Sequence, residues 1–226
     1  MKSHYILAID GPAGSGKSTV AKEVARRLGF LYVDTGAMYR ALTLNAIKKK
    51  LDFDDEDSLI ALAGSTDIEL RMGRDFRLSV ILEGVDVSDE IRKSYVTKNV
   101  RHVARVPRVR EQMVRLQRRA ASSGKGAVLE GRDIGTVVFP DADRKIYLDA
   151  DIGERVKRRF KELKGKGHDV SLDEVERDVV SRDDSDKTRD AGPLKKADDA
   201  IVIDTTDMTI DEVADSVVRQ IKTVQR

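Results

Sequence analysis

Short apolar runs recur along the chain and alternate with segments whose apolar residues have helical spacing. The five runs are Tyr5–Ile9, Leu31–Val33, Ala127–Leu129, Ile146–Leu148 and Ala200–Ile203. Nearly continuous apolar runs are typical of strands buried on both faces, as in a parallel sheet covered by helices. The pattern therefore predicts an α/β fold with a three-layer core around a five-stranded parallel sheet.

Between Ile68 and Val87 the pattern changes to an alternation of apolar and polar residues. Turn residues interrupt it at Gly73-Arg74-Asp75 and at Glu83-Gly84. Alternation with a period of two gives each strand one buried face, and glycine-containing breaks suit tight turns. We therefore expect a small antiparallel sheet outside the main sheet.

A second irregular stretch, from Ile152 to Ala191, is highly charged and has glycines at its joints. Ser171 and Glu174 have the spacing of a capping box, which predicts that a helix starts there. This helix is expected to carry Val175, Val179 and Val180 on one side. Charged, glycine-jointed helices inserted between core strands indicate a mobile lid.

The first predicted strand leads into a glycine-rich loop and then into a helical pattern that stops at Gly29. Residues 11–18 match the pattern G-x-x-x-x-G-K-S/T. Glycines allow backbone N–H groups to reach phosphate oxygens, the lysine reaches the β- and γ-phosphates, and the hydroxyl is placed to bind Mg²⁺. The residues predicted to bind a nucleoside triphosphate are Gly11, Pro12, Ala13, Gly14, Ser15, Gly16, Lys17 and Ser18, with Ser18 as the Mg²⁺ ligand.

Composition narrows the possible partners and compartments. Charged residues make up 36% of the chain, yet the net charge is only +2, which does not by itself indicate nucleic acid. The absence of cysteine excludes disulfides and fits a reducing compartment. No apolar stretch approaches the ~18 residues that a membrane span needs, and no signal-peptide pattern is visible. We expect a cytoplasmic monomer without membrane or nucleic-acid partners.

Arginines near the ends of predicted elements indicate a second, anionic ligand. Arg40 lies one turn into a helix that opens at Asp34-Thr35-Gly36, and Arg132 follows the third strand at its carboxyl end, where open α/β sheets bind ligands. A phosphomonoester has a second pKa near ~6, so its oxygen is already a nucleophile at pH 7 and needs alignment rather than a base. An alcohol acceptor would need a base, which Asp34 could supply, so both acceptor classes remain open.

Other classes of phosphate-loop protein fit less well. The chain has neither the N-K-x-D motif nor the D-x-x-G motif of switch GTPases, and it is too short for the extra domains of a typical motor. A small-molecule kinase remains. A nucleotide-dependent interaction module, which would bind ATP without turnover, is the alternative from another class.

Almost the whole chain resembles the bacterial cytidylate kinases, which are nucleoside monophosphate kinases of the P-loop fold. The resemblance rests on IDGPAGSGKST (9–19), VDTGAMYR (33–40), EGVDVSDEIR (83–92), PRVR (107–110), EGRDIGT (130–136), RDD (182–184), PL (193–194) and IDTT (203–206). It implies transfer of the γ-phosphoryl of ATP to CMP, and to dCMP, with Mg²⁺ as cofactor. Kinases for UMP, or for an alcohol such as shikimate, are the alternatives.

The resemblance also implies a role for each matched residue. Gly11–Thr19 bind the donor triphosphate, and the loop Thr205–Asp207 lies beside adenine. The acceptor phosphate is expected against Arg40, Arg132 and Arg189, its base near Thr35, Arg110 and Asp133, and its sugar near Arg182 and Asp186. Arginines among Arg155, Arg158 and Arg159 close over the phosphoryl group, so the expected catalytic residues are Lys17, Arg132, Arg158 and Arg189. The chain departs from its relatives at Arg101, where serine is usual.

The resemblance divides the chain into three parts. Residues 1–37, 101–151 and 191–226 form the P-loop core. Residues 38–100 form an inserted monophosphate-binding domain that contains the small antiparallel sheet. Residues 152–190 form the helical lid.

Overall fold

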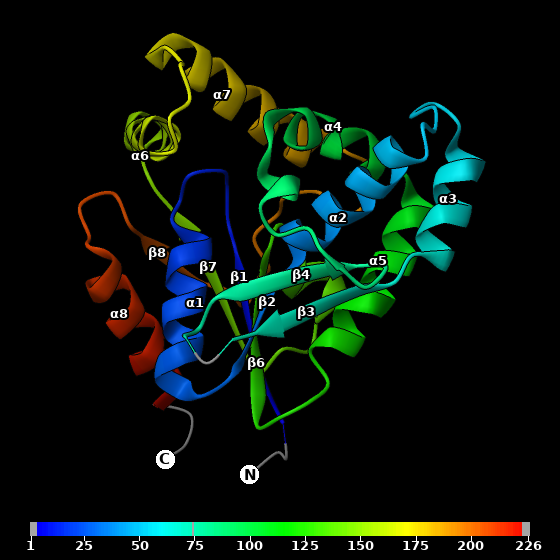
Figure 1. Ribbon diagram of the computed structural model, residues 1–226. Helices are drawn as coiled ribbons and strands as arrows, with labels where there is room; N and C mark the ends of the chain where they lie inside the picture. The colour runs from blue at the N-terminus through cyan, green and yellow to red at the C-terminus, as the bar shows by residue number, and fades with distance from the viewer. Residues whose placement is uncertain (1–3, 74, 223–226) are drawn as a thin grey trace.

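The computed structural model describes residues 4–73 and 75–222 and has a five-stranded parallel sheet at its centre (Figure 1). In spatial order the strands are β2 (Leu31–Asp34), β6 (Gly126–Gly131), β1 (Tyr5–Asp10), β7 (Arg144–Asp149) and β8 (Ile201–Asp204). Each predicted apolar run corresponds to one of these strands, which confirms the predicted sheet. The carboxyl ends of the parallel strands lie along one edge, from which the phosphate loop and the loop after β6 emerge.

Helices cover both faces of the sheet, so the three-layer core is confirmed. On one face lie α1 (Lys17–Leu28) and α8 (Ile210–Lys222), and on the other lie α2 (Thr35–Lys48) and α5 (Pro107–Ala120) (Figure 1). Because side chains alternate across a strand, Leu7 and Ile9 of β1 pack with α1 and α8, whereas Ile6 and Ala8 pack with α2 and α5. Within the described residues, no helix combines the length and the apolar character that crossing a membrane requires.

The segment between α2 and α5 forms the predicted small antiparallel sheet. Its order is β3-β4-β5, with β3 (Ile68–Met72), β4 (Leu78–Leu82) and β5 (Val85–Asp86). Around it lie α3 (Glu56–Ser65), η1 (Glu90–Arg92) and α4 (Ser94–Ala104). The predicted turn at Glu83-Gly84 joins β4 to β5, and Arg74 of the other predicted turn lies outside the described residues. Val80 and Leu82 are buried in the core that α2 shares, which gives the sheet its apolar face.

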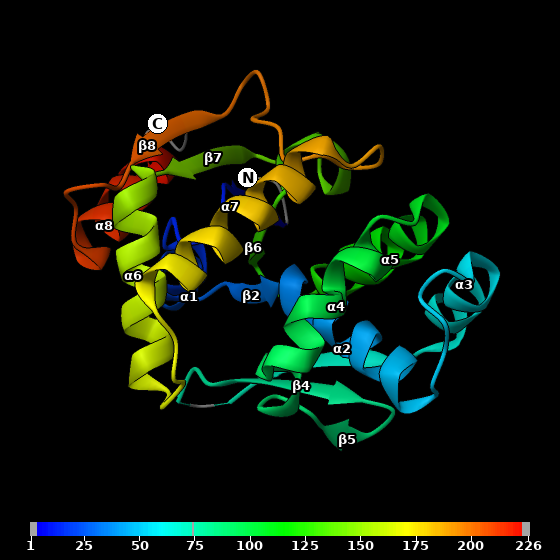
Figure 2. The same cartoon turned by 90° about the horizontal axis from the view of Figure 1, so that it is seen from above.

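Two helices lie above the carboxyl edge of the main sheet, α6 (Ile152–Gly165) and α7 (Leu172–Thr188) (Figure 2). Ser171 accepts the N–H of Glu174 at 3.2 Å, and the Glu174 carboxylate accepts the N–H of Ser171 at 2.8 Å, so the predicted capping box is present. Val175 and Val179 are buried, but Val180 is 41% exposed. The prediction that all three valines share one side was wrong, because consecutive helix residues differ by about 100° around the axis.

Candidate active site

Most of the predicted site residues line one cavity of about 940 Å³ at the carboxyl edge of the sheet. Its walls come from the phosphate loop, the start of α2, α4, the loop after β6, α6 and α7. The predicted residues in its lining are Ala13, Gly14, Ser15, Gly16, Lys17, Ser18, Thr19, Thr35, Arg40, Arg110, Arg132, Asp133, Arg158, Arg182, Asp186 and Arg189. Gly11, Pro12 and Arg155 lie outside this lining.

Two glycines of the phosphate loop adopt left-handed backbone conformations. Gly16, directly before α1, has a φ of 86°, and Gly14 has a φ of 78°. A Cβ on Gly14 would also lie 2.8 Å from the carbonyl oxygen of Arg155. Because L side chains rarely adopt this conformation, glycine is favoured at both positions. The loop thereby presents the N-terminus of α1, where backbone N–H groups and the helix dipole favour a phosphate.

Lys17 is buried within the phosphate loop. Its Nζ donates to the carbonyl oxygen of Pro12 at 2.5 Å and to Oγ of Ser15 at 3.3 Å. Burial and, after it, the positive charge of Arg132 lower the pKa of Lys17 to about 7, although the nearby acids Glu130, Asp186 and Asp10 act in the opposite direction. A neighbouring anion would favour the charged ammonium and raise this pKa again.

Two carboxylates enter the cavity from neighbouring strands. Asp34 on β2 and Glu130 on β6 are partners in the parallel register, so their side chains project from the same edge. Asp34 caps α2 by accepting the N–H of Ala37 at 2.7 Å. Glu130 accepts the hydroxyl of Tyr32 at 2.8 Å, and burial followed by the charge of Asp34 raises the pKa of Glu130. Ser18 also hydrogen-bonds to Glu130, which places a hydroxyl and a carboxylate together beside the loop.

Three arginines from separate elements meet in the cavity, and each is paired with an acid. Arg132, after β6, donates from Nε to Asp186 of α7 at 2.7 Å. Arg189, at the end of α7, donates to the other oxygen of Asp186 at 3.3 Å. Arg40 of α2 pairs with Asp34 at 3.2 Å. The structure thus brings together the three residues that were expected around the acceptor phosphate.

A buried ion pair between Arg110 and Asp133 lines one corner of the cavity. The guanidinium of Arg110 lies 5.4 Å from the ring centre of Tyr39, within cation–π range. Thr35 also lines this corner, but its hydroxyl donates to the backbone carbonyl of Glu130 at 2.6 Å. Arg110 and Asp133 therefore form a paired donor and acceptor at the wall of the cavity.

Arg155, Arg158 and Arg159 of α6 separate into two groups. Arg158 and Arg159 line the cavity, and Arg158 donates to the carbonyl oxygen of Thr205 at 2.6 Å and to its hydroxyl at 3.0 Å. Arg155 does not line the cavity, and its guanidinium is buried outside the lining. On α7, Arg182 lines the cavity, and burial lowers its pKa to about 10.

Arg101 lines the same cavity from α4. It lies three residues before Ala104, whose carbonyl oxygen accepts a hydrogen bond from Arg110 at 3.2 Å. Three residues are about one helical turn. The residue that departs from the expected serine therefore lies near the corner of the cavity that Arg110 occupies.

Comparison with known proteins shows to which family the chain belongs. A family model described as cytidylate kinase matches residues 7–223. This chain belongs to the cytidylate kinase family. The family predicted from the motifs is thereby confirmed.

Relatives that carry the name cytidylate kinase match almost the whole chain. The cytidylate kinase of Pelotomaculum thermopropionicum is 49% identical over 226 residues, which cover 100% of both chains. That of Desulforamulus reducens is 49% identical over 218 residues, covering 96% of this chain and 97% of the relative. That of Bacillus pumilus is 50% identical over 214 residues, covering 95% and 94%. The similarity therefore extends over the core, the inserted segment and the two helices above the cavity.

Reasoning from the sequence missed three buried groups in this cytidylate kinase family member. Glu130 and Tyr39 lie inside quoted motifs but received no role. Asp10, the last residue of β1, accepts the N–H of Ile134 at 2.9 Å and of Gly135 at 2.8 Å. These two donors begin η2 (Ile134–Val138), a single turn of π-helix. The signal that could have identified Asp10 is its position as a charged residue at the end of an otherwise apolar strand.

Proposed function

We propose that this protein is an ATP:CMP phosphotransferase, which converts CMP to CDP and dCMP to dCDP while ATP becomes ADP. The observation that carries this proposal is the shared cavity. The phosphate loop leaves β1, and Arg132 with Asp133 leaves the neighbouring strand β6, so a donor triphosphate and an acceptor phosphate can face each other across it. A ternary complex is the arrangement that this geometry favours.

The reaction needs alignment and charge neutralisation. An oxygen of the acceptor phosphate attacks the γ-phosphorus, and the bond from that phosphorus to the β–γ bridging oxygen breaks, which leaves ADP. The acceptor oxygen is already anionic near pH 7, so no base is required. Lys17, Arg132, Arg158 and Arg189 neutralise the charge that spreads over the equatorial oxygens, which is the main electrostatic contribution available to a phosphoryl-transfer site.

The side chains beside the phosphate loop fit Mg²⁺, which we infer to be the cofactor. Mg²⁺ prefers oxygen ligands and usually keeps several waters, so one hydroxyl with nearby carboxylates and substrate phosphates suits it. Ser18 would hold the ion, with Glu130 and Asp34 as the nearby acids. When bound with the donor, the ion supplies positive charge to the β- and γ-phosphate oxygens.

The proposed base reader is the buried pair of Arg110 and Asp133. An arginine can donate to O2 and N3 of cytosine, and a carboxylate accepts from the exocyclic amine, which uracil lacks. Arg182 and Asp186 are proposed for the sugar, Thr35 for the base and Arg40 for the acceptor phosphate. Gly11–Thr19 are proposed for the donor, with Thr205–Asp207 beside its base.

The three-part division into core, monophosphate-binding insert and lid is part of the same proposal. Closure of residues 152–190 would exclude water from the γ-phosphoryl group and so suppress ATP hydrolysis. Because the described cavity is formed within a single chain, we infer a monomer that acts in the cytoplasm on small molecules, without nucleic-acid or membrane partners.

A coupled assay of ADP release with MgATP tests the proposal. Its acceptors are CMP, dCMP, UMP, AMP and shikimate. We expect CMP and dCMP to give the highest kcat/KM, with the other three at least about tenfold lower, which corresponds to roughly 1.4 kcal/mol of discrimination. Lys17→Ala is the control for the donor site and should lose most of kcat. Turnover of shikimate, or ATP binding with no turnover of any acceptor, would support the alternatives instead.

A further inference from the structure

Both lid helices contact one residue of the phosphate loop. The backbone N–H of Ala13 donates to Oδ1 of Asp183 in α7 at 3.0 Å. The carbonyl oxygen of Ala13 accepts from Nη1 of Arg155 in α6 at 2.9 Å. The same Nη1 donates to Oδ2 of Asp183 at 2.5 Å, which closes the group. The lid thus uses both backbone polar groups of a loop residue that would otherwise be free to meet solvent or ligand.

The contact is buried and continuous with apolar packing. Arg155 and Asp183 are 7% and 4% exposed. Ala13 is itself a member of the small apolar core of the lid, together with Val156, Val175 and Val179. The carbonyl oxygen of Arg155 also lies only 2.8 Å from the place that a Cβ on Gly14 would take. The phosphate loop therefore packs directly against the small apolar core of the lid.

A buried ion pair is weak support for a purely stabilising role. Desolvation of two charges offsets most of their attraction, so apolar residues of similar size are often equally stable in the same place. Apolar residues cannot, however, hold a backbone N–H and a backbone carbonyl in fixed positions. What Arg155 and Asp183 provide is the orientation of Ala13 relative to α6 and α7.

We propose that Arg155 and Asp183 are positioning residues that fix the lid on the phosphate loop for phosphoryl transfer. Neither residue lines the cavity, so they act through the cavity-lining residues Arg158 and Arg182, whose helices they anchor. With the lid misplaced, water replaces the acceptor: its oxygen bonds to the γ-phosphorus, the bond to the β–γ bridging oxygen breaks, and ADP, inorganic phosphate and a proton result. This inference rests on the proposed function.

The test compares the amount of CDP formed with the amount of ADP released. Arg155→Met combined with Asp183→Leu removes both charges together, so neither is left buried alone. Asp183→Asn is a milder change that retains an oxygen to accept from Ala13. Lys164→Ala combined with Asp169→Ala is the matched control, because it removes an exposed ion pair of the lid, 3.2 Å long, away from the phosphate loop.

In the wild-type protein and in the control we expect one CDP per ADP. In the double variant we expect kcat to fall at least about tenfold, as misplacement of reacting groups does, and a clear excess of ADP over CDP. Asp183→Asn should fall between them.

A folded double variant with one CDP per ADP and a normal kcat would overturn the inference. If the double variant does not fold, the same readout on Asp183→Asn decides. Failure of the proposed function is recognised separately, because wild-type protein would then form no CDP. In that case, amide hydrogen exchange at Ala13 tests the positioning: it should be faster in Asp183→Leu than in the control, and equal rates would overturn it.

Discussion

Lys17 is the residue whose environment gives the most direct pH dependence. Its buried ammonium has a pKa lowered to about 7, whereas a bound triphosphate favours the charged form. At pH 8 the free protein holds Lys17 mostly neutral, so binding of ATP should take up protons. Calorimetry in buffers of different ionisation enthalpy measures this uptake. Lys17→Arg, which stays charged, should show less uptake, and equal uptake in both proteins would contradict the expectation.

Asp10 gives a second pH dependence, through stability. Burial raises its pKa to about 6 even though two backbone N–H groups donate to it. The folded protein therefore binds a proton more tightly than the unfolded chain does, and the contribution of Asp10 to stability decreases as pH rises through 6. We expect the unfolding free energy of wild type, relative to Asp10→Asn, to rise between pH 7 and pH 4.

Denaturant titrations across this pH range measure the difference. Asp143→Asn is the matched control, because Asp143 also accepts a backbone N–H of β1, from Ile6 at 2.8 Å. A difference between wild type and Asp10→Asn that does not change with pH would show that Asp10 titrates normally.

Asp133 is the residue whose substitution should change base preference. Asp133→Asn replaces one acceptor oxygen by an amide donor, which suits the carbonyl of uracil better than the amine of cytosine. We expect the ratio of kcat/KM for CMP over UMP to fall at least about tenfold, and CMP affinity to fall as well because Arg110 loses its charged partner. Steady-state kinetics with both acceptors measure it, with Asp184→Asn as the control. An unchanged ratio would exclude Asp133 as the base reader.

The sequence predicted which residues line the cavity better than it predicted the residues with which each of them forms ion pairs and hydrogen bonds. Arg40, Arg132 and Arg189 come from three distant segments, yet strand order and the ligand edge of a parallel sheet bring them together. The sequence left open which of positions 155, 158 and 159 faces the cavity, because they are close together on one helix and periodicity alone does not decide it. Arg155 is the one whose guanidinium is buried outside the cavity lining. Its buried partners lie 142 and 28 residues away in the chain.

At the scale of elements, the capping box of α7 predicts how stable the start of this helix is. Ser171→Ala removes the acceptor for the Glu174 N–H and should destabilise the start of α7 by about 1 kcal/mol. Because the cap lies at the rim of the lid, we expect faster amide exchange in the first turns of α7 and little change in the core. Mass-spectrometric hydrogen exchange measures this.

Thr209→Ala is the matched control, because Thr209 and Glu212 make the same reciprocal bonds at the start of α8. Helix α8 packs on the main sheet, so loss of its cap should lower the free energy of global unfolding more than loss of the α7 cap does. Equal exchange in α7 of wild type and Ser171→Ala would show that packing, and not the cap, holds the start of this helix.

Elements were predictable where burial alone dictates the pattern. The strands β1, β2 and β6 are almost wholly buried, so their apolar runs are nearly continuous. The edge strand β8 was found by its apolar run as well, although Val202 is 49% exposed. The single π-turn η2 has no such pattern: it forms because Asp10 accepts two consecutive N–H groups at its start, which is a contact 124 and 125 residues away in the chain. Such turns depend on tertiary hydrogen bonds that local sequence does not reveal.

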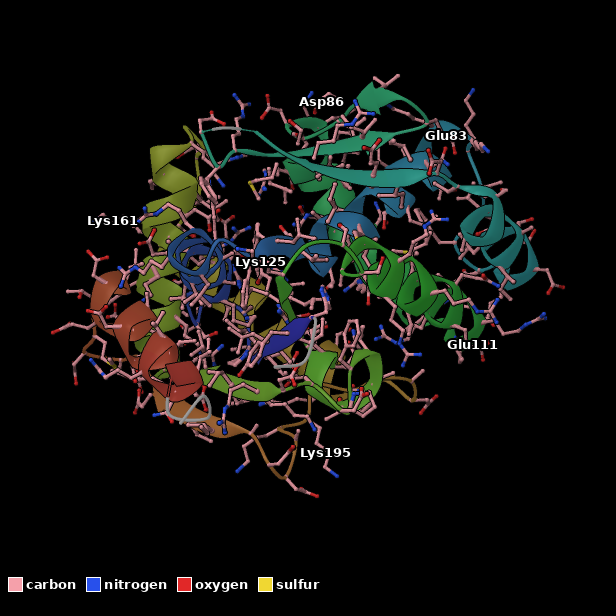
Figure 3. All side chains as sticks on the ribbon, turned by 90° about the horizontal axis from the view of Figure 1, so that it is seen from below. Glu83, Asp86, Glu111, Lys125, Lys161 and Lys195 are labelled. Carbon is pink, nitrogen blue, oxygen red and sulfur yellow. The ribbon has the colours of Figure 1, made fainter. Side chains whose placement is uncertain are left out.

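At the scale of the whole molecule, the inserted segment and the lid stand on different sides of the cavity. In Figure 3, Asp86 lies on the small antiparallel sheet and Lys161 on α6. We expect the distance between these sites to shorten when CMP and a non-hydrolysable ATP analogue bind together, because both parts close on the ligands. The chain has no cysteine, so Asp86→Cys with Lys161→Cys accepts two spin labels specifically.

Pulsed electron paramagnetic resonance then measures the distance between the two spin labels with and without ligands. Labels at Lys125 and Lys195, which Figure 3 shows on the part of the molecule that contains the main sheet, form the control pair and should keep their distance. An unchanged distance between the labels at 86 and 161 would mean that the enzyme binds both nucleotides without closing.

The pairing of three cavity-lining guanidinium groups with carboxylates has a consequence for how the protein responds to ionic strength. Arg40, Arg132 and Arg189 already have Asp34 or Asp186 as counter-ions. A phosphate group that binds there therefore replaces these carboxylates as the partner of the arginines, and it releases few bound salt anions into solution. Since mobile counter-ions are the source of salt dependence, nucleotide affinity should vary little with added potassium chloride. Small monovalent anions should likewise compete poorly for this site.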